Sequence, residues 1–119
     1  VALRAAFVAA MAGHQVAVVC PTTLLARQHF NNFRDRFAGF PLQIGRLSRL
    51  VPPKEAKETK QGLAEGKIDV VIGTHAILAK GVEFKRLGLV VVDEEQRFGV
   101  THKERLKALK TDVHQLTLT

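Results

Sequence analysis

The chain has 119 residues, with 18 Lys and Arg against 11 Asp and Glu, and its formal net charge is +7. A hydrophobic share of 46% with 24% charged residues is typical of one soluble globular domain and excludes a disordered, collagen-like or disulfide-rich chain. A single Cys, and no Cys/His group with the spacing of a zinc site, favour a reducing, cytoplasmic setting. The basic balance indicates a polyanionic partner, and the lack of Trp and Tyr favours contact with backbone phosphates over stacking on bases.

The two ends of the sequence lead us to expect a piece of a longer protein. The chain begins at Val1 without Met, inside an Ala-rich run that has no N-cap residue before it, and it stops in the strand-like residues 116–119 without a closing turn. No apolar run approaches the ~20 residues that a membrane-spanning helix requires. We therefore expect a soluble fragment.

Short apolar runs alternate with helical patterns along the chain. We expect strands at residues 16–20, 42–47, 68–72, 89–92 and 114–119. We expect helices in residues 1–12, after Thr22 or Thr23, in residues 54–65 before Gly66, in residues 75–79 and in residues 101–110, with a loop or hairpin at residues 81–88. Strands that are apolar throughout and alternate with helices predict a parallel sheet covered by helices on both faces.

Polar residues gather where three of the buried strands end, which is the edge at which parallel sheets bind ligands. The three segments are Pro21, Thr22 and Thr23; Gly73, Thr74 and His75; and Asp93, Glu94, Glu95 and Gln96. Hydroxyl and backbone N–H groups at a helix start suit phosphate oxygens, and Gly permits close approach to a backbone. The same residues also serve as plain helix caps, and both interpretations stay open.

The run from Asp93 to Glu95 is the most informative feature. An apolar strand that ends in Asp-Glu is the arrangement by which ATPases hold Mg²⁺ with one carboxylate and activate water with the next. A solvated acidic loop is the alternative. The phosphate-binding run G-x-x-x-x-G-K-[ST] is absent from the 119 residues, so an ATP site within this chain would be incomplete.

At these motifs the sequence resembles the motor of superfamily 2 helicases, and more closely the RecG-like translocase module of the Mfd family of transcription-repair coupling factors. The similarity covers nearly the whole chain. Residues 18–29 (VVCPTTLLARQH) are similar to motif Ia, residues 72–78 to motif Ib, residues 92–100 and 102–105 to motif II with its extension, and residues 116–119 to the approach to motif III.

The resemblance implies a role for each matching residue. Asp93 would hold Mg²⁺ through water, Glu94 would orient the lytic water as a base, and both would belong to the ATP site. Gln96 would link the nucleotide to motif III; many members carry His there, but Gln hydrogen-bonds without titrating. The residues implied in contact with the DNA backbone are Pro21, Thr22, Thr23, Gly73, Thr74 and His75.

The resemblance also implies a fold and an activity. Residues 1–119 would be a partial first RecA-like P-loop NTPase domain, an α/β fold lacking the P-loop strand before Val1 and the rest of motif III after Thr119. Because that strand is interior in the family, we expect an exposed or differently filled sheet edge.

The intact protein would be an ATP- and Mg²⁺-dependent double-stranded DNA translocase in the bacterial cytoplasm. It would displace stalled RNA polymerase and recruit the excision-repair damage-recognition protein through other domains. The fragment alone would not hydrolyse ATP. A RecG-type branch-migration helicase, or a non-catalytic doubly wound module that binds nucleic acid or protein, are the alternatives.

Overall fold

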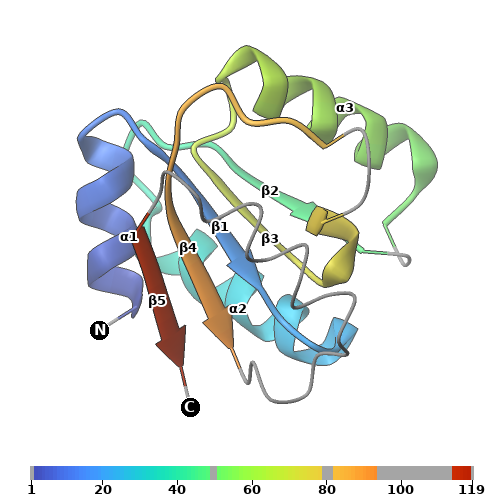
Figure 1. Ribbon diagram of the computed structural model, residues 1–119, viewed down its shortest axis with the longest axis horizontal. Coiled ribbons are helices and arrows are strands. Elements are labelled where there is room, and N and C mark those ends of the chain that lie inside the picture. Colours follow the sequence, from blue (N-terminus) through green and yellow to red (C-terminus); the bar gives the residue numbers. More distant parts are fainter. Residues whose placement is uncertain (1, 49–50, 79–81, 94–113, 119) are drawn as a thin grey trace.

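The computed structural model describes residues 2–48, 51–78, 82–93 and 114–118, and strands alternate with helices through these ranges (Figure 1). The helices are α1 (Ala2–Met11), α2 (Thr23–Arg36), α3 (Pro53–Glu65) and the 3₁₀ helix η1 (His75–Leu78). The strands are β1 (Gln15–Val19), β2 (Ile44–Leu47), β3 (Val70–Gly73), β4 (Leu87–Asp93) and β5 (His114–Leu118). The predicted elements in the described ranges are therefore all present, and the helix expected at residues 101–110 lies outside them.

All five strands are parallel and pair in the order β2-β3-β1-β4-β5. The parallel sheet predicted from the apolar runs is confirmed. Of the loop or hairpin expected at residues 81–88, the loop is confirmed for residues 82–86, which form no strand, whereas residues 87 and 88 already belong to β4, which lies parallel to its neighbours. Among the described strands, β5 forms one edge of the sheet. That an interior strand is missing beside an exposed edge stays a prediction.

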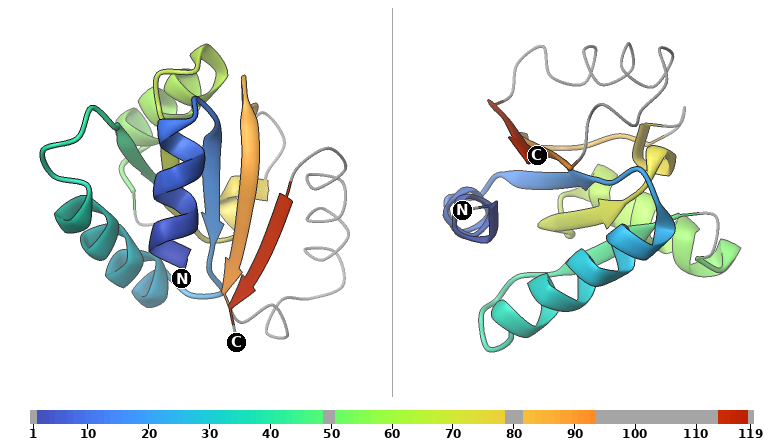
Figure 2. Two further views of the ribbon diagram at one scale, coloured as in Figure 1. Left: turned by 90° about the vertical axis from the view of Figure 1, so that its left-hand side faces the viewer. Right: turned by 90° about the horizontal axis from the view of Figure 1, so that it is seen from below.

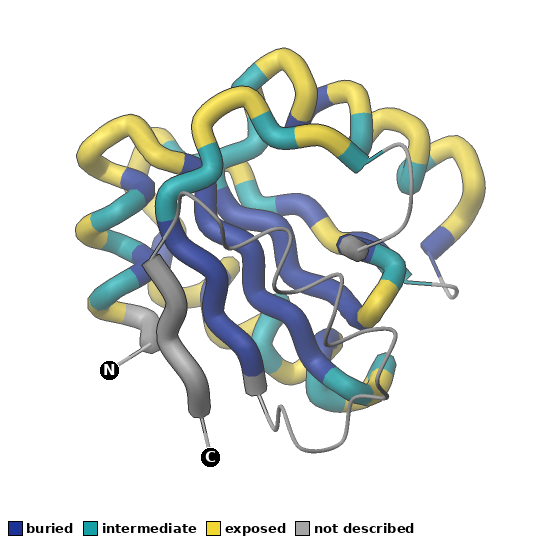
Figure 3. Tube along the Cα trace, viewed as in Figure 1, coloured by how far each residue is buried: buried dark blue, intermediate teal, exposed yellow. Residues whose placement is uncertain are grey.

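Alternate residues of each strand point to opposite faces of the sheet. Val16, Val18 and Val91 belong to one core cluster with residues of α1 and α2, while Val19 and Val90 belong to a second with residues of α3 and η1. Helices therefore cover both faces, and Figure 2 shows α2 lying along one of them. Figure 3 shows the consequence, since buried residues run along β1, β3 and β4 and exposed ones along the helices.

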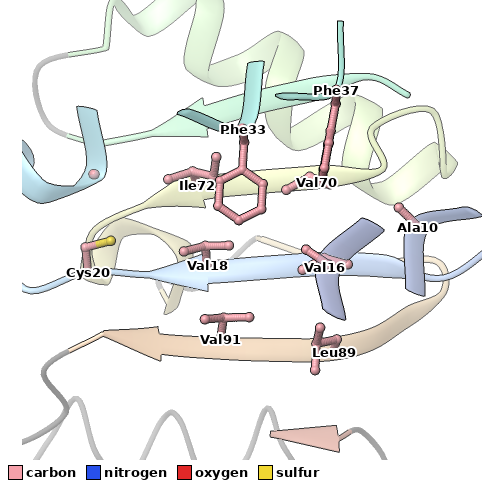
Figure 4. Close-up of a cluster of buried hydrophobic side chains, with 12 residues drawn as sticks. Ala10, Val16, Val18, Cys20, Phe33, Phe37, Val70, Ile72, Leu89 and Val91 are labelled. Carbon is pink, nitrogen blue, oxygen red and sulfur yellow. The ribbon is translucent and has the colours of Figure 1, made fainter. Parts of the chain in front are cut away.

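Aromatic side chains at the C-terminal end of α2 and at its C-cap cover the first of these clusters. The rings of Phe33 and Phe37 pack edge to face with centroids 5.4 Å apart, and Phe7 of α1 lies 5.6 Å from Phe37. Figure 4 shows the rings of Phe33 and Phe37 lying over Ile72 and Val70 of β3. This packing holds the C-terminal half of α2 against the sheet.

Two predicted helix boundaries are confirmed by their geometry. Thr22 is the N-cap of α2, and Gly66 ends α3 in the left-handed region at φ +79°. Among the described residues, no helix has the length and apolar character needed to cross a membrane.

Candidate functional site

The strand register brings the three predicted segments to one edge of the sheet. Val19 of β1 is level with both Gly73 of β3 and Val92 of β4. The next residues along each strand are therefore neighbours at the carboxyl edge, and Asp93 is the last residue of β4. The backbone of Asp93 is placed there, whereas Glu94, Glu95 and Gln96 lie outside the described residues.

The turn between β1 and α2 joins this edge to a helix start. The backbone N–H of Cys20 donates to the Gly73 carbonyl at 2.8 Å, which ties the turn to β3. The hydroxyl oxygen of the exposed Thr22 accepts a hydrogen bond of 3.2 Å from the backbone N–H of Leu25. A hydroxyl that accepts in this way can still donate its own hydrogen to a phosphate oxygen. No acidic residue occupies the first turn of α2, so the partial positive charge of this helix end is not offset there.

Gly73 and Thr74 make structural contacts at the end of β3. A Cβ added at Gly73 would overlap the carbonyl oxygen of Leu47, so only Gly permits this approach of β2. Thr74 is 4% exposed; its backbone N–H donates to the Leu47 carbonyl, and its hydroxyl accepts from the N–H of Ala76 at 3.4 Å. These contacts within the protein explain why Gly and Thr occupy the two positions. Their contact with DNA stays a prediction. His75, by contrast, is exposed at the edge.

A hollow of about 260 Å³ opens beside Thr23, between α2 and the end of β2. Arg27, Arg46 and Ser48 line it over an apolar floor that includes Ile72. Arg27 is exposed and lies four residues after Thr23, which places both on one face of α2. Arg27 was not among the residues expected to contact phosphate, and this spacing is the signal that could have identified it.

Asp93 is a described residue of this edge whose chemistry fits a hard cation. Strand β4 delivers Asp93 to the same edge as the Thr22 turn, and carboxylate oxygen is the donor that Mg²⁺ prefers. The described residues include no group of three or more His, Cys, Asp or Glu able to hold a metal ion. A single carboxylate is compatible with magnesium that keeps most of its water ligands.

The comparison with protein families gives a match along the whole chain. The family described as DEAD/DEAH box helicase matches residues 1–119. Transcription-repair-coupling factors of Staphylococcus haemolyticus (strain JCSC1435) and Staphylococcus aureus (strain USA300) are each 56% identical to it over 119 residues. That alignment covers 100% of this chain and 10% of each relative, so the chain spans about a tenth of their length.

Solved structures share the fold. RecG bound to a three-way DNA junction superposes with a TM-score of 0.70 at 38% identity, over 90% of this chain and 14% of that one. The helicase MrfA bound to DNA superposes with a TM-score of 0.66 at 18% identity, over 89% of this chain and 15% of that one, which is a likeness of fold alone. The fold is thus that of a RecA-like helicase domain, as the resemblance implied.

Proposed function

Because the chain belongs to the DEAD/DEAH box helicase family, we propose that it forms most of the first motor domain of an ATP-dependent double-stranded DNA translocase that couples transcription to DNA repair. The observation that carries the proposal is the alignment of the ends of β1, β3 and β4 at one edge, where the helicase motifs begin. Identity of 56% to transcription-repair-coupling factors against 38% to RecG favours this function over a branch-migration helicase. RNA polymerase and the excision-repair damage-recognition protein would then bind other domains of the parent.

Double-stranded DNA would lie against the turn before α2. Thr22 offers a hydroxyl donor at a helix start, and Arg27 and Arg46 supply positive charge beside Thr23. Contacts of this kind recognise phosphates and carry no sequence information, which suits a motor that moves along any sequence. Pro21 and His75 would lie beside the same DNA strand.

ATP and Mg²⁺ would bind at the β4 side of this edge. Asp93 would hold Mg²⁺ through water, Glu94 would act as the base toward the attacking water, and Gln96 would connect the nucleotide to motif III. Bound Mg-ATP would supply the transferable phosphoryl group. Catalysis of phosphoryl transfer depends almost entirely on positioning, and the chain contains no G-x-x-x-x-G-K-[ST] run, so we expect the 119 residues alone not to hydrolyse ATP. The motor would work in the bacterial cytoplasm.

The DNA contact is tested by changing Thr22 while keeping its cap. Asp caps a helix as well as Thr does, so Thr22→Asp preserves α2 and places a negative charge where a phosphate would lie. We expect this variant to bind a labelled duplex roughly tenfold more weakly than the unsubstituted chain in fluorescence anisotropy. Thr22→Ser keeps the hydroxyl and should bind as tightly as the unsubstituted chain. Equal binding by all three proteins would contradict the proposal.

The catalytic statement is tested by ATP turnover. DNA-stimulated hydrolysis by the purified 119-residue chain would show that its phosphate site is complete, against our expectation. A longer chain that includes a G-x-x-x-x-G-K-[ST] run should show ATP turnover if the family assignment of Asp93 and Glu94 holds. A chain that binds duplex DNA but gains no turnover in this way would instead behave as the non-catalytic binding module.

A further inference from the structure

Arg46 lies between two hollows of opposite charge. On one side is the hollow of about 260 Å³ whose rim carries Arg27. On the other is a smaller one of about 180 Å³, whose lining includes Glu55 and Glu58 of α3. Arg46 and Phe30 line both. One guanidinium therefore separates a basic surface next to the proposed DNA contact from an acidic surface on α3.

Two groups hold this guanidinium in place. Its Nε donates to Oε2 of Glu55 at 3.2 Å, and its central carbon lies 5.5 Å from the centroid of the Phe30 ring. The side chains of Arg46 and Glu55 are 46% and 43% exposed, so solvent screens the ion pair and the pair is weak. The contact with Phe30 does not involve Glu55, so it stays available to the guanidinium if the carboxylate is displaced.

We propose that Glu55 is a built-in competitor for the DNA phosphate, which occupies Arg46 in the free protein and is displaced when DNA binds. The proposal rests on the function proposed above. A phosphate accepts two parallel hydrogen bonds from a guanidinium, whereas Glu55 takes one, at Nε. The exchange of one anion for another leaves Arg46 paired in both states. Glu55 thereby lowers affinity for DNA, as a motor that must release each phosphate requires.

The matched variants are Glu55→Gln and Glu58→Gln. Both remove one negative charge from the same hollow and the same helix, but only Glu55 is paired with Arg46 among the described residues. We expect Glu55→Gln to tighten duplex binding roughly two- to fivefold, which is the strength of an exposed ion pair, and Glu58→Gln to tighten it less. In the Arg46→Ala background the gain from Glu55→Gln should shrink to that of Glu58→Gln.

The outcomes separate this inference from the proposed function. A Glu55→Gln variant that binds more weakly, or only as well as Glu58→Gln, overturns the competition, and so does a gain that persists without Arg46. If the unsubstituted chain binds no duplex, or if Thr22→Asp leaves its affinity for duplex unchanged, the proposed function fails instead. Thermal melting by circular dichroism, read for every variant, separates a change in binding from a loss of folded protein.

Discussion

Gln15 and Arg86 are joined by two hydrogen bonds of 2.7 Å: the backbone N–H of Gln15 donates to the Arg86 carbonyl, and the backbone N–H of Arg86 donates to the side-chain oxygen of Gln15. The side-chain nitrogen of Gln15 also donates to the carbonyls of Leu63 at 2.9 Å and Ile68 at 3.0 Å. This amide is 2% exposed. It ties the starts of β1, β3 and β4 to the end of α3, at the edge opposite the candidate site.

Replacing Gln15 should therefore destabilise the whole sheet. Gln15→Leu keeps a similar volume but removes three side-chain hydrogen bonds, one buried and two partly buried, and at roughly 1 kcal/mol each we expect a loss of about 2–4 kcal/mol in the free energy of unfolding. Urea denaturation followed by circular dichroism measures it. The same change at the exposed Gln61, whose side-chain nitrogen donates to Glu65 and to no other residue of the described ranges, should cost under about 0.5 kcal/mol. Equal costs at the two positions would show that the buried bonds contribute nothing.

Gly62 makes room for Ile68, and this role opposes ordinary helix preference. Gly to Ala inside a helix is normally stabilising by about 1 kcal/mol. A Cβ at Gly62, however, would lie 2.6 Å from Cγ1 of Ile68, so we expect Gly62→Ala to destabilise by about 1–3 kcal/mol. In the Ile68→Ala background, where that atom is gone, the same change should become neutral or stabilising. A denaturant double-mutant cycle measures the difference, and additive effects would contradict the steric explanation.

The sequence predicted the sheet better than the site, for a physical reason. Apolar runs such as residues 16–20 and 89–92 identify strands buried on both faces, because burial demands a local composition that can be read directly. The role of Gln15 and the hollow beside Arg27 were not predicted, because each depends on contacts distant along the chain: Gln15 meets Arg86 across 71 positions. Thr22 was read correctly as a cap since capping is a local interaction.

A substitution at Gly73 tests whether the absence of a side chain there serves the packing of β2 against β3 or the close approach of DNA. The atom that a Cβ would meet is a backbone carbonyl, which cannot rotate aside, so Gly73→Ala should separate the ends of β2 and β3 and lower the thermal midpoint without DNA present. Gly45→Ala, in β2, would meet only the tips of Ile68 and Thr59 at 3.0 Å and should be milder. If Gly73→Ala retains full stability and loses only DNA affinity, close approach of the nucleic acid is its role.

Glu65 provides a local electrostatic prediction. Hydrogen bonds from Lys67, at 3.0 Å, and from Gln61, at 3.2 Å, hold the pKa of the Glu65 carboxyl below its ordinary value, and the Lys67 charge adds to this. Because the folded pKa is the lower one, any stabilisation is present above the unfolded pKa and is lost as pH falls through the folded pKa. Lys67→Ala should raise the pKa of Glu65 toward its ordinary value in an NMR titration, while Lys60→Ala should leave it unchanged. High salt should reduce the part of the shift that comes from charge.

Arg27 should contribute a phosphate contact that Arg36, on the same helix, does not. Arg27 lies in the second turn of α2 and lines the hollow beside Thr23, whereas Arg36 is the last residue of that helix. The two side chains carry the same charge at different positions on the helix. We expect Arg27→Ala to weaken duplex binding by about tenfold and to reduce the slope of log affinity against log salt by about 1, the signature of one lost phosphate contact.

The salt titration separates this contact from a general effect of charge. Arg36→Ala lowers the net charge of +7 equally, so a long-range field alone would make the two variants alike. Arg27→Lys should keep the slope and recover only part of the affinity, because an ammonium cannot reproduce the paired hydrogen bonds of a guanidinium. If Arg27→Ala and Arg36→Ala shift affinity and slope equally, the turn before α2 is not where DNA binds, and the orientation proposed for the duplex must be abandoned.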